Sequence, residues 1–142
     1  MMAVLLAWML RGPTLFVAEV QVSTVLAASV ARCESSARYD DGAAVLATAL
    51  NRARLLRRSL ASVLVQPWQF AWSCPASPRT WSWRHVQLGL DAALGTLRAP
   101  AWAWKALMYC GPSDSRDRCH DRREAHFEIV GEIVHTFYGR GG

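Results

Sequence analysis

Residues 42–52 read GAAVLATALNR, an apolar run that opens with a glycine and closes with an Asn-Arg pair. Apolar residues recur at steps of three and four, which predicts a helix over 43–57 with one inward face. The cluster at 39–42, Tyr-Asp-Asp-Gly, reads as the turn and cap that start this helix. The inward set is Val45, Leu46, Ala49 and Leu50, and the outward set is Arg54, Arg57 and Arg58.

Further helices are predicted on both sides of this run. The same periodicity favours a helix over 20–38. Ser59 caps a short helix over 60–65, which the Gln66-Pro67 step ends. A helix over 83–94 closes at Gly95. The remaining segments are an irregular aromatic loop at 68–79, a short apolar run at 106–109, a polar loop at 110–124, and a stretch at 126–138 that fits either a helix or a pair of strands.

Length and composition indicate one folded, basic domain. The chain has 142 residues and 52% hydrophobic residues, so one core is expected and disorder is not. Fifteen Arg and one Lys against eleven acids give a net charge of +5. A negatively charged partner is the natural inference, and nucleic acid, anionic lipid and an acidic cell-wall polymer all qualify.

The first residues, 1–19, are predicted to be an apolar leader, with the folded domain over 20–142. The run is shorter than the roughly 20 apolar residues that a spanning helix needs, because Arg11-Gly12-Pro13 interrupts it. A secretory signal, cleaved or anchoring, fits it loosely. The alternatives are an amphipathic first helix that packs on the core and a misassigned start codon.

Four cysteines favour two disulfides in an exported protein. The predicted pairs are Cys110–Cys119, across a polar loop, and Cys33–Cys74. Metal-binding spacing is poor, since the chain has no C-x-x-C pair, and no metal or cofactor is expected. A thiol nucleophile at Cys33 with His126 or His135 as base is the weaker alternative, because no orienting third residue is visible.

Glu34 lies at the end of an otherwise apolar helix. A carboxyl group held against apolar and aromatic surface stays protonated at neutral pH and can donate a proton to a leaving oxygen. This is the general acid that glycosidic cleavage requires. Aromatic side chains that could stack on sugar rings follow it along the chain, at Trp68, Phe70, Trp72, Trp81, Trp83, Trp102, Trp104, Tyr109 and Tyr138.

In this order the short motifs resemble those of the SleB-like cell-wall hydrolases, over roughly residues 28–139. The matching positions are Glu34, the run at 42–52, the stretch from 59 to 70 ending in Gln-Pro-Trp-Gln-Phe, the helix end at 91–95, the Ala-Leu-Met-Tyr at 106–109 and the His-Thr-Phe-Tyr at 135–138. The chain departs from the family at Ser35-Ser36-Ala37-Arg38 and at Ala71.

The resemblance implies a lysozyme- or transglycosylase-like single domain, mainly α with a few short strands. It implies cleavage of peptidoglycan between N-acetylmuramic acid and N-acetylglucosamine, with Glu34 as catalytic acid and base. A lytic transglycosylase needs this one acid. If water replaces the muramic hydroxyl, the enzyme is a muramidase, and Asp40 or Asp41 could then be the second carboxylate. The predicted substrate-binding residues are Gln69, Phe70, Tyr109 and Tyr138. Asn51 and Arg52 are expected to brace the helix behind the site.

The partner is then the peptidoglycan glycan strand, with membrane contact only through an uncleaved leader. We expect a monomer exported to the periplasm or cell envelope, or released as a phage-type lysin. The alternatives are a peptidoglycan-binding protein of the same fold without turnover and, with only the charge in its favour, a small basic nucleic-acid-binding protein.

Overall fold

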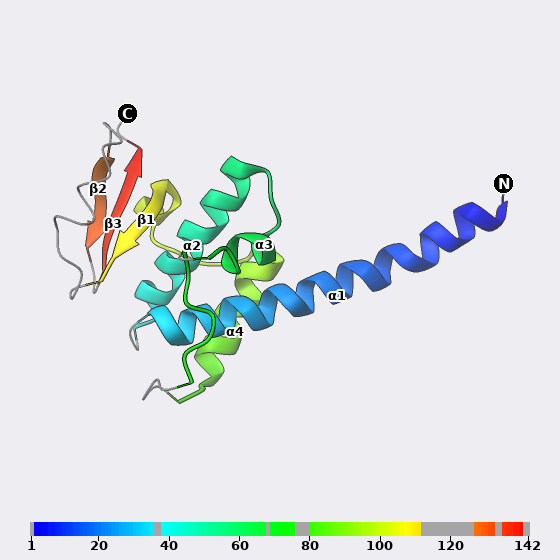
Figure 1. The fold of residues 1–142 in the computed structure, drawn as a ribbon, viewed down its shortest axis with the longest axis horizontal. Coiled ribbons are helices and arrows are strands. Elements are labelled where there is room, and N and C mark those ends of the chain that lie inside the picture. Colours follow the sequence, from blue (N-terminus) through cyan, green and yellow to red (C-terminus); the bar gives the residue numbers. More distant parts are fainter. Residues whose placement is uncertain are drawn as a thin grey trace.

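Helix α2 (Tyr39–Leu56) forms the centre of the core in the computed structural model, which describes residues 2–35, 38–67, 69–75, 80–111, 127–132 and 135–140. Every residue from 41 to 49 is buried. A helix that is apolar all round is covered from all sides. Here the cover comes from elements before and after it in the chain, as Figure 1 shows. The sequence predicted only one inward face, because alanines do not reveal how many neighbours approach them.

Helix α1 (Met2–Glu34) runs without a break from the predicted leader into the predicted helix over 20–38. Its first half extends away from the rest of the molecule (Figure 1). Its second half packs on α4 (Trp83–Leu94). Close contact depends on Gly89, where an added Cβ would lie 2.7 Å from the amide nitrogen of Ala28 and would collide with the carbonyl oxygen of Thr24. The helix ends at Glu34, earlier than expected.

Local signals account for the other helix ends. Helix α2 starts at Tyr39, earlier than expected, because Asp40 and Asp41 occupy its first turn, where the helix dipole favours negative charge. Ser59 caps α3 (Leu60–Leu64) by accepting a 3.2 Å hydrogen bond from the amide of Ser62. Gly95 ends α4 with a φ of 74°, as its position predicted.

A small antiparallel sheet follows the helices and lies at one end of the molecule (Figure 1). The 3₁₀ helix η1 (Ala101–Lys105) leads into β1 (Ala106–Cys110), and β3 (Thr136–Arg140) lies between β1 and β2 (Phe127–Glu132). Of the two structures expected for 126–138, the strand pair is therefore the one found, whereas most of the predicted polar loop at 110–124 lies outside the described residues. The molecule is a mainly helical single domain with a small sheet, as predicted.

The register of the sheet assigns its side chains to two faces. Tyr109 of β1 is opposite Phe137 of β3, and both belong to the main core. Met108 is opposite Tyr138, and these two pack with Cys110 in a separate cluster. Since neighbouring residues in a strand point to opposite faces, the sheet directs Tyr109 toward the helices and Tyr138 away from them.

Candidate active site

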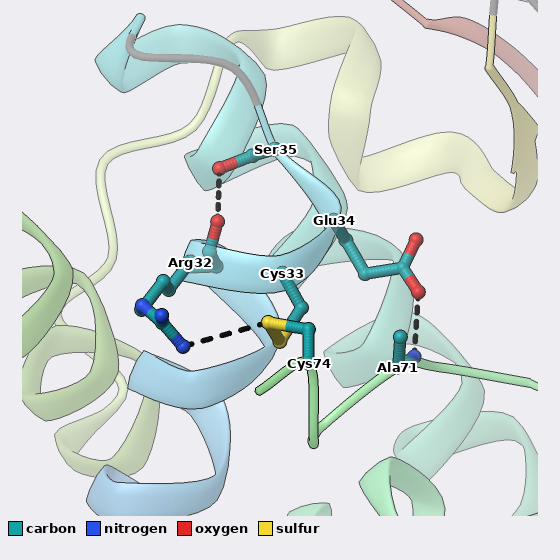
Figure 2. Close-up of a disulfide and its surroundings, with 7 residues drawn as sticks. Arg32, Cys33, Glu34, Ser35, Ala71 and Cys74 are labelled. Atoms are coloured by element: carbon teal, nitrogen blue, oxygen red, sulfur yellow. Dashed lines mark hydrogen bonds between the residues drawn. A yellow bond between two sulfur atoms is a disulfide. The ribbon is translucent and has the colours of Figure 1, made fainter. Parts of the chain in front are cut away.

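Glu34 lies where three segments meet. Its Oε1 accepts a 2.5 Å hydrogen bond from the backbone amide of Ala71, and its Oε2 accepts a 3.0 Å hydrogen bond from the hydroxyl of Tyr109. Figure 2 shows the side chain leaving the end of α1 toward the loop that carries Ala71. The glutamate is partly buried. The sequence predicted apolar and aromatic surface around the carboxyl group. The structure places the aromatic Tyr109 there, and it contacts Glu34 through its hydroxyl.

A disulfide holds this loop against the helix end. Cys33 and Cys74 are bonded, with their Cα atoms 5.7 Å apart, close to Glu34 and Ala71 (Figure 2). This is one of the two predicted pairings, and it is confirmed. A bonded Cys33 has no thiol, so the nucleophile considered from the sequence is excluded. The other predicted pairing, Cys110–Cys119, includes Cys119, which lies outside the described residues.

Tyr109 is held in place by aromatic rings. Its ring centroid lies 5.2 Å from that of His135, 5.5 Å from that of Phe137 and 6.2 Å from that of Phe70. Burial and then the negative charge of Glu34 raise the pKa of Tyr109 well above its ordinary value of 10.0. The phenol therefore keeps its proton at neutral pH and remains a hydrogen-bond donor to Glu34.

Arg52 joins the loop to the strand. Its Nε donates a 2.5 Å hydrogen bond to the carbonyl of Leu107, and its Nη1 donates to Oε1 of Gln69. The guanidinium also lies over the ring of Phe70, 5.5 Å from the centroid. A planar group with several fixed donors can bridge such partners at once. Arg52 thus fixes Gln69 and Phe70, two of the predicted substrate residues, relative to β1.

Asn51 performs a similar task one residue earlier. Its Nδ2 donates hydrogen bonds of 2.9 Å and 2.8 Å to the carbonyls of Ala103 and Ala106. These carbonyls lie in η1 and at the first residue of β1, so Asn51 fastens α2 to the start of the strand. Asn51 and Arg52 together set the position of the strand that delivers Tyr109.

Asp41 and His135 form a buried pair next to this group. Oδ1 of Asp41 lies 2.8 Å from Nδ1 of His135, and Asp41 is fully buried. The sequence did not predict this pair, because 94 positions separate the two residues and the histidines show no common spacing. The one available signal was the His-Thr-Phe-Tyr motif at 135–138, which places His135 two residues before Phe137.

The remaining predicted site residues lie elsewhere. Tyr138 is buried with Met108 and Cys110 on the other face of the sheet. Asp40 is exposed, with an oxygen 3.8 Å from a guanidinium nitrogen of Arg38. The structure therefore brings Glu34 and Tyr109 into direct contact. Phe70 lies beside Tyr109, and Gln69 is hydrogen-bonded to Arg52. Tyr138 is separated from this group by the sheet.

Metal-binding clusters and membrane spans are both missing from the described residues. Within these ranges no group of three or more His, Cys, Asp or Glu side chains could hold a metal ion. No helix in the described part of the chain combines the length and apolarity needed to cross a membrane. Comparison with protein-family models, with curated proteins and with solved structures found no match.

Proposed function

We propose that this protein cleaves the glycan strand of peptidoglycan, with Glu34 as the acid and base, on a small fold of the lysozyme and transglycosylase type. The observation that carries the proposal is the pair of donors on Glu34, the Ala71 amide and the Tyr109 hydroxyl. Each carboxyl oxygen keeps one further position beside its donor. In the protonated acid, one of these positions holds the O–H that can donate to the glycosidic oxygen. A carboxyl group oriented in this way suits proton transfer at a defined position.

The chemistry needs one acid in its simplest form. Glu34 protonates the oxygen between N-acetylmuramic acid and N-acetylglucosamine, and the glycosidic bond breaks. The resulting carboxylate takes the proton of the muramic 6-hydroxyl, whose oxygen closes a 1,6-anhydro ring on the anomeric carbon. If water takes the place of that hydroxyl, the same residue acts in a muramidase.

The placement of the two other candidate acids supports the single-acid route. Asp41 is fully buried against His135, and Asp40 faces Arg38 at the surface. A second carboxylate for water activation must line the substrate on the opposite side from the acid. The buried pairing of Asp41 and the exposed position of Asp40 both suit this role poorly.

Charge and redox chemistry fit a protein that acts in the cell envelope. Disulfides persist in oxidising compartments, and Cys33 and Cys74 form a disulfide. The net charge of +5 attracts the chain to an anionic wall. We therefore propose export to the envelope or release as a lysin, with the glycan strand as partner.

The test is digestion of purified sacculi by the wild type and by Glu34→Gln. Glu19→Gln is the matched control, because Glu19 is exposed on the same helix. We expect soluble fragments with anhydro ends from the wild type and the control, detected by mass spectrometry. Glu34→Gln should release none and still bind sacculi. Equal digestion by Glu34→Gln would overturn the proposal.

A second candidate is a wall-binding protein without turnover. It is favoured by the same two hydrogen bonds, because both oxygens of Glu34 already have partners inside the protein. In that case wild type and Glu34→Gln both bind sacculi, neither releases fragments, and the Gln variant is the less stable of the two because it loses a charged acceptor.

A further inference from the structure

The pair of Asp41 and His135 is buried, titratable and unused in the chemistry described above. Asp41 has no exposed surface, and His135 is 7% exposed. Burying a carboxylate is costly unless it is hydrogen-bonded, and the 2.8 Å contact with Nδ1 of His135 provides such a bond. Aliphatic residues at both positions would avoid this cost, so we expect the pair to have a specific role.

The geometry connects the pair to Glu34 through one ring. The ring of His135 meets the ring of Tyr109 edge-on, at an interplanar angle of 78°. The hydroxyl of Tyr109 then reaches Oε2 of Glu34. Because Asp41 fixes Nδ1, it also fixes the plane of the imidazole, and the imidazole packed against the phenol ring limits the sideways displacement of that ring, which would move the hydroxyl.

Charged groups face Tyr109 from three elements. Glu34 reaches it from the end of α1, Arg52 and Asp41 from α2, and His135 from the residue before β3. Glu34 and Asp41 oppose ionisation of the phenol and raise its pKa, whereas Arg52 lowers it. A change at Asp41 therefore acts on Tyr109 in two separable ways, by charge and by position.

We propose that Asp41 and His135 are positioning residues that hold the Tyr109 hydroxyl on Glu34. The pair touches neither the reacting carboxyl group nor, in this proposal, the substrate. Its catalytic consequence rests on the proposed function, whereas its effect on Tyr109 does not. Loss of the pair lets the phenol ring shift away from Glu34 and admits water beside it.

The test compares Asp41→Leu, which removes the acceptor, with Asp41→Asn, which keeps an oxygen acceptor but removes the charge. Thr48→Val is the matched control, because Thr48 is also fully buried on α2 and its hydroxyl bonds within the helix, to the carbonyl of Ala44. Ionisation of Tyr109 is followed by phenolate absorbance. Subtraction of the same titration of Tyr109→Phe removes the signals of Tyr39 and Tyr138.

We expect the ionisation midpoint of Tyr109 to be highest in the wild type, lower in Asp41→Asn and lowest in Asp41→Leu. The Thr48→Val control should keep the wild-type midpoint. Turnover of sacculi should fall by about tenfold or more in Asp41→Leu, since small misplacements of catalytic groups have effects of this size. Asp41→Asn should keep most of the wild-type turnover. Equal midpoints in the Asn and Leu variants would mean that only charge matters, and this result would overturn the proposal.

A second variant covers the case in which Asp41→Leu does not fold. His135→Asn keeps a nitrogen donor for Asp41 and removes the ring that faces Tyr109. We expect a lower Tyr109 midpoint here too, and an unchanged midpoint would contradict the proposal. If the midpoints shift as expected while the wild type digests no sacculi, positioning is supported and the proposed function fails. If the wild type digests sacculi and the midpoints do not change, the proposed function is supported and the positioning role fails.

Discussion

The hydroxyl of Tyr109 lies 3.0 Å from Oε2 of Glu34, although 75 positions separate the two residues. This contact joins the end of α1 to the first strand of the sheet. On its other oxygen, Glu34 holds the loop that the disulfide ties to α1. Glu34 is thus fixed by elements from three parts of the chain, and its surroundings can be changed one contact at a time.

Replacing Tyr109 by Phe removes this hydroxyl and keeps the ring. We expect turnover to fall by about tenfold or more, because the acid loses an orienting donor. The free energy of unfolding at neutral pH should fall by about 1 kcal/mol, the usual net size of one hydrogen bond. Urea unfolding and sacculus digestion measure the two effects.

The same variant predicts a pH dependence. The pKa of Tyr109 is raised in the folded state above its ordinary value of 10.0. The stability that this group contributes is therefore fully present below pH 10 and is lost as the pH rises through the folded-state pKa. The difference in unfolding free energy between wild type and Tyr109→Phe should narrow above pH 10. A difference that grows there would contradict the assignment.

Loss of the Cys33–Cys74 disulfide should lower both stability and activity. The bond closes a loop with a sequence separation of 41, for which chain entropy gives about 4 kcal/mol. Without it the loop is free to leave the helix end, and the Ala71 amide leaves Glu34. The double variant Cys33→Ser/Cys74→Ser should show a lower unfolding midpoint and slower digestion of sacculi. A double variant with wild-type turnover would show that this loop does not position the acid.

Arg52→Lys should be damaging despite keeping the charge. Lysine has no planar fork with which to reach Leu107 and Gln69 together. We expect a loss of about 1–2 kcal/mol in unfolding free energy. Arg58→Lys is the control, since Arg58 is exposed just after the end of α2. Equal stability of the two variants would contradict the bridging role.

Asn51→Leu tests the attachment of β1. The substitution leaves the carbonyls of Ala103 and Ala106 without their donor. Buried carbonyls that lose a partner cost about 1–3 kcal/mol each, so the unfolding free energy should fall by about 2–6 kcal/mol. Denaturant unfolding measures this, with Thr48→Val as the control from the same buried helix. A loss no larger than that of the control would show that the two bonds contribute little.

Much of the helical layout followed from local signals. Ser59 and Gly95 mark helix ends whatever the rest of the chain does, because capping depends on a few adjacent residues. Glu34 could be proposed as the catalytic acid because it ends an apolar helix. The Cys33–Cys74 pairing was what remained once Cys110 was paired with Cys119 across the polar loop, with three connectivities possible for four cysteines.

What could not be predicted depends on contacts across the chain. The side on which Tyr138 lies follows from the register of β3 on β1, and the sequence leaves 126–138 open between helix and strands. The full burial of α2 depends on which elements approach its alanines. The sequence favours Asp41 as a cap residue or second carboxylate, because its partner His135 lies 94 positions away.

Gly89→Ala tests the contact between α1 and α4. On helix propensity alone, alanine in place of glycine favours α4 by about 1 kcal/mol. Here the added Cβ would lie 2.7 Å from the amide nitrogen of Ala28 and would collide with the carbonyl oxygen of Thr24. These are backbone atoms of α1, which cannot rotate away as a side chain can. We therefore expect a net loss of about 1–3 kcal/mol in unfolding free energy.

Gly95→Ala separates this steric effect from backbone strain. Gly95 has a φ of +74°, and no atom lies within 4 Å of an added Cβ. Its substitution therefore adds only the strain of a left-handed backbone, which lowers the unfolding free energy by about 1 kcal/mol. Chemical denaturation of both variants, followed by tryptophan fluorescence, gives the two losses. Since α1 carries Glu34 at its end, the displacement of α1 in the Gly89→Ala variant should also slow digestion of sacculi, whereas Gly95→Ala should not. A Gly89→Ala protein more stable than the wild type would mean that the two helices are not packed as closely as described.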